Sequence, residues 1–282
     1  MNMMKPLIQP QELRALLTNP ALVLIDARTG PGLPEKYQAQ HLPGALWVDL
    51  DLDLADVKEN AAEGGRHPLP EVEKFAALLG QLGITPQSHV VVYDDKNGAN
   101  AAARFWWMLA AVGHTQVQVL DGGLDAALAA GIPTSSAVET PKTAPAYPAQ
   151  AWQLPQVELA QVEAATQDPA FLIIDVRDAV RYRGEHEPID TVAGHIPNAV
   201  NIPLTSNLQG NGFFLAPEAL KEKYTAAIGG RQPDQVIVHC GSGVTACHTL
   251  LAMAQAGLEI PNLYVGSWSE WSRNGKTIAT GA

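Results

Sequence analysis

The chain carries the same series of motifs twice, and this repetition constrains its fold more than any other feature. The first half contains, in order, LVLIDAR (22–28), HLPGALWVDL (41–50) and HVVVYDD (89–95). The second half contains, in the same order and at nearly the same spacing, FLIIDVR (171–177), GHIPNAVNIPL (194–204) and QVIVHCG (235–241). Self-similarity over such a long interval predicts two copies of one domain. A length of 282 residues also suits two hydrophobic cores better than one.

The two copies are separated by a segment with no apolar period. Residues 134–150 read TSSAVETPKTAPAYPAQ, with three prolines. Such a composition is typical of an extended linker that lies on the surface. We therefore expect an N-terminal domain over residues 1–145 and a C-terminal domain over residues 146–282.

Each copy alternates short apolar runs with helical patterns. Val90–Tyr93 precedes a helical pattern over Asn100–Val112, and Val236–His239 precedes one over Thr245–Ala256. Strands that alternate with helices predict an α/β fold, in which a largely parallel sheet is flanked by helices on both faces. Functional groups of such sheets gather at the carboxyl ends of the strands, which is where Cys240 stands.

Composition narrows the classes of function. The net charge of −11 argues against nucleic-acid binding and against an acidic membrane surface, although a local basic pocket remains compatible with a small anionic substrate. No apolar run approaches the length of a membrane span, and MNMMKPLIQPQELRALL at the start lacks the features of a signal peptide. The two cysteines lie too close together for a structural disulfide, so we expect free thiols and a cytoplasmic protein.

The cysteine at the end of the second copy's strand is the strongest candidate for chemistry. Cys240 is followed by a loop that leads into a helix, and the loop residues are Gly241, Ser242, Gly243, Val244 and Thr245. Two glycines let successive backbone N–H groups face inward, and the helix start adds unpaired N–H groups. Together they would stabilise an anion on or beside the sulfur, as a nucleophilic thiolate requires. The alternative is a buried structural cysteine.

The equivalent strand of the first copy ends differently. VVVYD overlays VIVHC, so Asp94 stands where the second copy has Cys240. The N-terminal domain therefore lacks the thiol, and we expect one chemical domain and one domain kept for packing.

The second cysteine is interpreted as a core residue. Cys247 shares an apolar helical stripe with Leu250, Leu251 and Ala254. A metal site built from His239, Cys240, Cys247 and His248 is disfavoured, because their spacing matches no standard ligand pairing. His239 is also expected to point to the opposite side of its strand from Cys240. No metal is therefore expected.

At this point several motifs resemble a known family. The duplicated domain, Asp175-Val176-Arg177, GHIPNAVNIP and SWSEW (267–271) are similar to the tandem-domain rhodanese superfamily of sulfurtransferases. The neutral loop after Cys240 resembles the 3-mercaptopyruvate sulfurtransferase branch more than the thiosulfate branch. The resemblance implies a persulfide on Cys240, formed from a small anionic sulfur donor with release of pyruvate. It also implies an acceptor (cyanide, a small thiol or a thioredoxin-like protein) and no cofactor.

The resemblance also implies residues that bind the donor. Arg181 matches the family's substrate-carboxylate arginine. A second arginine that mercaptopyruvate enzymes carry further along is absent, since this chain has Pro188-Ile189-Asp190 there. Arg183 and Arg104 are the candidates to replace it, and a solvated surface charge is the alternative for Arg183.

A proton relay is implied in the same way. Ser242 matches the serine of a Ser/His/Asp relay, while His67 in GGRHPLP and Asp51 in WVDLDLDL match its other two members. Pyruvate leaves as an enolate-like species, so a proton donor near Ser242 would assist the reaction. A loop histidine and one carboxylate of an acidic run are the plainer interpretations of His67 and Asp51.

Other residues recur in both copies, including the copy without a thiol. They are Asp26 with Arg28, Asp175 with Arg177, and the pair His41 and His195. Features shared by an active and an inactive copy are expected to serve the fold, as strand-end ion pairs or loop hydrogen bonds.

Three other functions compete with this one. A cysteine phosphatase needs an arginine six residues after its cysteine to grip the phosphoryl oxygens, and Ala246 occupies that position. Thiosulfate sulfurtransferase by the same persulfide mechanism is the nearest alternative. A non-catalytic rhodanese-like sulfur carrier or interaction module is more distant, since Cys240 and its glycines are present.

Overall fold

A computed structural model describes residues 4–282, and its contacts divide the chain into two compact units. The first unit comprises the residues up to Ala55, Pro70–Gln153 and Gly210–Phe213. The second unit comprises Asp56–Leu69, Leu154–Gln209 and Phe214–Ala282. Residues 1–3, the beginning of the segment where no leader is expected, lie outside the described part. The domain boundary near residue 145 stays a prediction.

The first unit contains five strands and five helices within the described residues. In chain order they are β1 (Leu7–Ile8), α1 (Pro10–Leu16), β2 (Leu22–Asp26), α2 (Leu33–Ala39), β3 (Ala45–Trp47), α3 (Val72–Gln81), β4 (His89–Tyr93), α4 (Ala102–Ala111), β5 (Val117–Leu120) and α5 (Gly123–Ala129).

The second unit repeats this order and adds two short 3-10 helices. Its elements are β6 (Gln156–Val157), α6 (Leu159–Ala165), β7 (Leu172–Asp175), α7 (Ala179–Tyr182), β8 (Ala199–Asn201), η1 (Leu204–Asn207), α8 (Pro217–Ile228), η2 (Pro233–Gln235), β9 (Val236–His239), α9 (Ala246–Gln255), β10 (Asn262–Tyr264) and α10 (Ser267–Trp271).

Both sheets are parallel and have the same topology. The strand order is β1-β5-β4-β2-β3 in the first unit and β6-β10-β9-β7-β8 in the second. The central strands β4 and β9 are buried along their whole length, as expected for β-branched runs covered on both faces. The α/β fold predicted from the alternation of strands and helices is confirmed.

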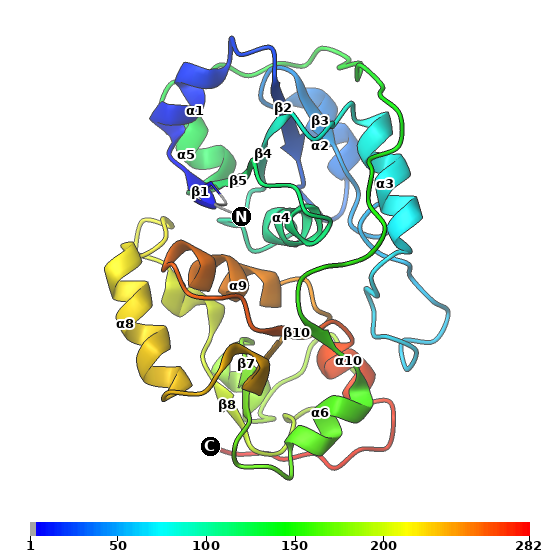
Figure 1. Cartoon of the computed structure of the whole chain (residues 1–282), viewed down its shortest axis with the longest axis vertical. Coiled ribbons are helices and arrows are strands. Elements are labelled where there is room, and N and C mark those ends of the chain that lie inside the picture. The colour runs from blue at the N-terminus through cyan, green and yellow to red at the C-terminus, as the bar shows by residue number, and fades with distance from the viewer. Residues whose placement is uncertain (1–3) are drawn as a thin grey trace. The chain divides into compact units, whose positions relative to one another are not determined.

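Helices cover both faces of each sheet (Figure 1). In the first unit α1 and α5 pack on one face, in a core that includes Leu13, Leu24 and Leu124, while α3 and α4 lie on the other. In the second unit α6 and α10 share one core, and α8 and α9 cover the opposite face. Helix α4 is buried at every position, which explains its apolar sequence ARFWWML around the whole circumference.

The proline-rich segment is extended, as the sequence predicts. Residues 136–153 contain no helix or strand, and backbone hydrogen bonds attach this segment to α3 of the first unit. The N–H of Ala144 donates to the carbonyl of Gly80 at 2.8 Å, and the N–H of Tyr147 donates to the carbonyl of Ala76 at 2.9 Å. A Cβ on Gly80 would lie 2.7 Å from the carbonyl oxygen of Pro145, so a glycine is needed for this close approach.

None of the helices in residues 4–282 combines the length and the apolar composition that a membrane crossing requires.

Candidate active site

Matching ion pairs fix the strand ends in both units. Arg28 Nη2 lies 2.7 Å from Asp26 Oδ2, and Arg177 Nη2 lies 2.7 Å from Asp175 Oδ2. Each guanidinium also donates to a backbone carbonyl of a following loop at 2.7 Å. All four side chains are buried, so the pairs close the strand-to-loop turns. The structural role predicted from their recurrence is confirmed.

His239 belongs to this framework in the second unit. Its Nε2 lies 3.7 Å from Asp175 Oδ2, and burial lowers the pKa of the imidazole, which therefore stays neutral at neutral pH. Burial opposes the charge on Asp175, but the ion pair and hydrogen bonds from Arg177 lower the pKa of the carboxyl. Asp175 therefore stays ionised and holds Arg177.

In the first unit, the loop after β4 wraps around the carboxylate of Asp94. This side chain is fully buried and accepts hydrogen bonds from four backbone N–H groups. The donors are Lys96, Gly98 and Asn100, each at 2.8 Å, and Ala102 at 3.1 Å. A ring of inward-facing amides of this kind is an anion-binding nest. Burial raises the pKa of the Asp94 carboxyl, and the four backbone hydrogen bonds oppose this rise because they favour the charged form.

In the second unit, the equivalent loop follows Cys240 directly. Cys240 is 1% exposed and joins β9 to the loop that leads into α9. The loop is held from the side of α10, since the N–H groups of Trp268 and Ser269 donate to the carbonyls of Cys240 and Gly241 at 3.1 and 2.9 Å. Gly243 has φ +75°, and a Cβ there would collide with the carbonyl of Val265. The left-handed conformation of Gly243 turns the chain within this loop, while the inward direction of its N–H groups stays a prediction.

The backbone donors of this loop contrast with those around Asp94. The amides of Gly241, Ser242, Val244 and Thr245 donate to no acceptor among residues 4–282. Gly241, Ser242 and Val244 are buried, and Thr245 is half-buried at the start of α9, where backbone N–H groups lack intrahelical partners. The equivalent strand ends thus differ, since amides bind a carboxylate in the first copy and have no acceptor beside a thiol in the second.

A serine that sequence reasoning missed also contacts Cys240. Ser267 Oγ accepts the N–H of Cys240 at 3.2 Å and lies 4.0 Å from its Sγ. Ser267 has φ +53°, a left-handed conformation that disfavours a non-glycine residue. The equivalent position in the first copy is Gly123, with φ +63°. Comparison of VGSWSEW (265–271) with DGGLDAA (121–127) would have found this replacement of a glycine by a strained serine.

The segment Asp56–Leu69 packs within the second unit, against α10. The N–H of Gly64 donates to Glu270 Oε1 at 2.9 Å, and the N–H of Arg66 donates to Ser269 Oγ at 3.0 Å. A Cβ on Gly65 would collide with the carbonyl of Gly266, so the glycine permits this close backbone approach. The SWSEW motif thus anchors the segment that carries His67.

His67 and Ser242 come together as the relay hypothesis requires. His67 Nδ1 lies 2.7 Å from Ser242 Oγ, and Ser242 is 6% exposed. Asp51 lies in an exposed turn of the first unit, where its N–H donates to Asp49 Oδ1 at 2.8 Å. Its place in the relay stays a prediction.

The predicted donor-binding arginines have different surroundings. Arg181 is held by Glu187, with Nε–Oε2 and Nη2–Oε1 distances of 3.1 and 2.6 Å. Arg183 pairs with the exposed Glu185 at 2.6 Å. Arg104 is fully buried in α4 of the first unit. Arg181 lies beside the cysteine loop, since a Cβ on Gly241 would be 3.5 Å from its Nη2.

Cys247 lies in the core of the second unit, as predicted. It is fully buried on α9, and its Sγ lies 3.4 Å from the carbonyl oxygen of Gly243.

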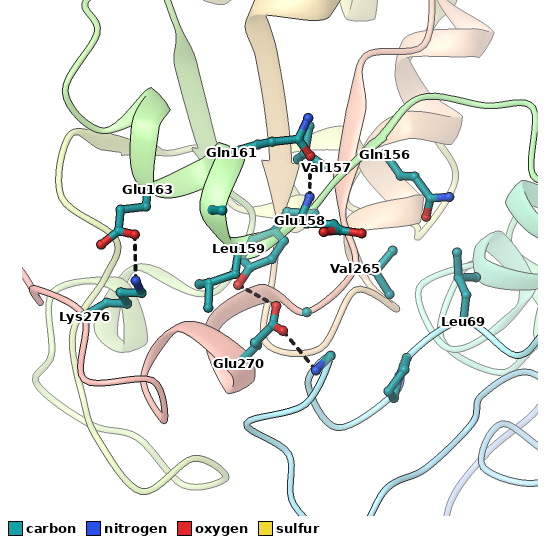
Figure 2. A pocket seen from close by; sticks show the side chains of 15 residues that line it. Leu69, Gln156, Val157, Glu158, Leu159, Gln161, Glu163, Val265, Glu270 and Lys276 are labelled. Carbon is teal, nitrogen blue, oxygen red and sulfur yellow. Dashed lines mark hydrogen bonds and ion pairs between the residues drawn. The ribbon is translucent and has the colours of Figure 1, made fainter.

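A pocket of about 610 Å³ lies in the second unit between α6 and the end of β10 (Figure 2). Cys240 is not among its lining residues. Figure 2 shows that three of its charged side chains are engaged, since Glu163 pairs with Lys276 at 2.6 Å and Glu270 accepts the N–H of Gly64 and the hydroxyl of Tyr264. This pocket is therefore not the site of the thiol chemistry.

Comparisons with known proteins agree with the two-domain fold described above. The family model "Rhodanese-like domain" matches residues 9–130 and 158–274, which confirms the two rhodanese-like copies. A "Probable 3-mercaptopyruvate sulfurtransferase" of Pseudomonas aeruginosa is 41% identical, over 98% of each chain. A "Putative thiosulfate sulfurtransferase" of Mycobacterium tuberculosis is 40% identical over 84% of this chain and 81% of its own. The crystal structure of a 3-mercaptopyruvate sulfurtransferase from Escherichia coli covers 95% of this chain and 100% of its own, with a TM-score of 0.78 and 31% identity.

Proposed function

Because the chain belongs to the rhodanese family and is a sulfurtransferase, we propose that it takes sulfur from 3-mercaptopyruvate, carries it as a persulfide on Cys240 and passes it to a thiol acceptor. One observation supports this above all others. The amides of the Cys240 loop have no acceptor among the described residues, whereas the corresponding loop of the first copy closes on the Asp94 carboxylate.

The first step forms a sulfur–sulfur bond and breaks a carbon–sulfur bond. The Cys240 thiolate attacks the sulfur of the donor, and the electron pair of the C–S bond moves to the methylene carbon. The products are the enolate of pyruvate and a persulfide on Cys240. The loop amides, which have no other acceptor among the described residues, stabilise the negative charge before and after the transfer. The sulfur stays on the cysteine, so this step needs no cofactor.

The enolate then needs a proton on carbon. The Ser242 hydroxyl delivers this proton, and the imidazole of His67, whose Nδ1 lies 2.7 Å away, restores a proton to the serine. This contact also supports the choice of donor. Thiosulfate would release sulfite, which takes the electron pair without protonation of a carbon atom.

The second step returns the enzyme to its thiolate. An acceptor thiolate attacks the outer sulfur of the persulfide, the sulfur–sulfur bond of Cys240 breaks, and the acceptor leaves as a persulfide. Cyanide would react in the same way and leave as thiocyanate. The net reaction needs no external oxidant or reductant.

The function is tested by comparing kcat/KM for 3-mercaptopyruvate and thiosulfate, and by mass spectrometry of the protein after incubation with donor alone. We expect a preference for 3-mercaptopyruvate and one added sulfur on the peptide that contains Cys240. Cys240→Ser should abolish both pyruvate release and sulfur addition, while Cys247→Ser should retain both. Full activity of Cys240→Ser would contradict the mechanism, and a large preference for thiosulfate would assign the alternative function.

A further inference from the structure

A buried aspartate organises the arginines beside the cysteine loop. The Asp190 side chain is completely buried and lies within ion-pair distance of three guanidinium groups. Arg66 Nη1 and Arg273 Nη1 lie 2.5 and 2.8 Å from Asp190 Oδ1, while Arg181 Nη2 lies 3.6 Å from Oδ2. Asp190 occupies the part of the chain where the family resemblance leads us to expect a second arginine. Its carboxylate instead forms an ion pair with Arg66 of the segment Asp56–Leu69.

Two of these guanidinium groups face the cysteine loop. A Cβ built on Gly241 would lie 3.2 Å from Arg66 Nη2 and 3.7 Å from Arg181 Nη1. Within the described part of the chain, neither nitrogen donates to an acceptor, since Arg66 uses Nη1 for Asp190 and Arg181 uses Nε and Nη2 for Glu187. Both side chains are partly exposed, at 23% and 15%. Two unoccupied donors therefore point to the residue that follows the thiol.

The ion pairs around Arg66 and Arg181 leave a net positive charge beside the cysteine loop. The network consists of four guanidinium groups (Arg66, Arg177, Arg181, Arg273) and three carboxylates (Asp175, Glu187, Asp190). One positive charge is therefore in excess inside a mostly buried cluster, where Coulomb interactions are stronger than in water. An anion is the ligand that balances it.

We propose that Arg66 binds the carboxylate of the sulfur donor together with Arg181, and that it thereby serves as the second donor-binding arginine of this enzyme. This inference rests on the proposed function. Planar guanidinium groups match the two oxygens of a carboxylate, and two of them on one side of the loop would hold the donor with its sulfur toward Cys240. Asp190 acts as a positioning residue, because it fixes the direction of the Arg66 guanidinium.

The test measures KM and kcat for both donors in Arg66→Gln and Arg66→Lys. For Arg66→Gln we expect the KM for 3-mercaptopyruvate to rise roughly 10- to 100-fold while kcat changes by less than about threefold. Arg66→Lys keeps the charge but loses the planar pair of donors, so the KM for 3-mercaptopyruvate should rise more than the KM for thiosulfate. Lys221→Gln, which removes one exposed positive charge from α8, is the matched control and should leave both KM values unchanged.

Each outcome bears on one conclusion. A folded Arg66→Gln with unchanged KM, or with kcat reduced equally for both donors, overturns the role of Arg66. If Arg66→Gln does not fold, Arg66→Lys decides, and equal KM changes for both donors overturn the role. Wild-type protein that releases no pyruvate from 3-mercaptopyruvate contradicts the proposed function itself, which is a separate result.

Discussion

Replacing Cys240 with aspartate tests directly whether its loop is built for an anion. The same loop in the first copy holds the Asp94 carboxylate with four N–H groups at 2.8–3.1 Å. A carboxylate oxygen and the outer sulfur of a persulfide both lie two bonds from Cβ. Cys240→Asp should therefore place a negative charge where the persulfide would carry it. The matched control is Cys240→Asn, which has nearly the same shape and no charge.

The expected difference follows from the hydrogen bonds that each side chain can accept. Four amides, those of Gly241, Ser242, Val244 and Thr245, have no acceptor within the described residues. Aspartate offers two oxygens to these donors, whereas asparagine offers one oxygen and an NH2 group that opposes them. A hydrogen bond to a charged group contributes about 1.5–3 kcal/mol, and burial of the charge offsets part of this. We expect Cys240→Asp to be about 2–4 kcal/mol more stable than Cys240→Asn.

Urea denaturation at neutral pH, followed by circular dichroism, measures this difference in the free energy of unfolding. Both variants should lack sulfurtransferase activity, so stability alone carries the comparison. Cys240→Asn as stable as Cys240→Asp, or more stable, would refute the anion-binding design. The corresponding pair in the first copy, wild type against Asp94→Asn, should show a difference of the same sign.

Three further predictions concern the relay, the strained serine and a half-buried lysine. Ser242→Ala should lower kcat with 3-mercaptopyruvate roughly 100-fold and spare thiosulfate turnover, and equal losses with both donors would exclude a relay that begins at His67. Ser267→Gly should change the unfolding free energy by less than about 1 kcal/mol, because relief of the left-handed strain offsets the added chain entropy, yet lower kcat/KM by roughly tenfold. Burial lowers the pKa of Lys223 to about 8 from its ordinary value of 10.5. As the pH falls from 10.5 to 8, unfolded chains bind a proton on Lys223 before folded chains do. The free energy of unfolding therefore decreases as the pH falls across this window. Lys223→Met should flatten the pH dependence of Tm there.

Much of the fold follows from the sequence because its signals are local. The runs Val90–Tyr93 and Val236–His239 lie within strands of the structure, and the helical patterns after them coincide with α4 and α9 to within two residues at each end. β-Branched residues in short runs and apolar stripes at helical spacing depend on few long-range contacts. Because the same series of motifs occurs twice, the sequence also predicts that the two sheets have the same strand order, as they do.

The part of the site that escaped sequence analysis depends on contacts between distant segments. Arg66 reads as one charge in a glycine-rich loop, and only its packing against Ser269 and Asp190 brings it to Gly241. Arg183, two residues from Arg181, was the nearer candidate in sequence, but its ion pair is with Glu185 at the surface. Distance along the chain does not predict which arginine lies at the site when hydrogen bonds to another element hold a distant loop there.

The duplication also separates what the fold needs from what the chemistry needs. Both copies keep the strand-end Asp–Arg pair, with the same 2.7 Å contact, so that pair can be assigned to the fold. The copies differ at the strand end, with Asp94 against Cys240, and at the start of the last helix, with Gly123 against Ser267. In the first copy the residue at each position suits its backbone. A carboxylate accepts the surrounding amides, and a glycine adopts the positive φ without strain. The second copy has unpaired amides and a strained serine at the same two positions, and both contact the thiol or its loop. Because both differences lie at the thiol or its loop, they support the reactivity that we propose for Cys240.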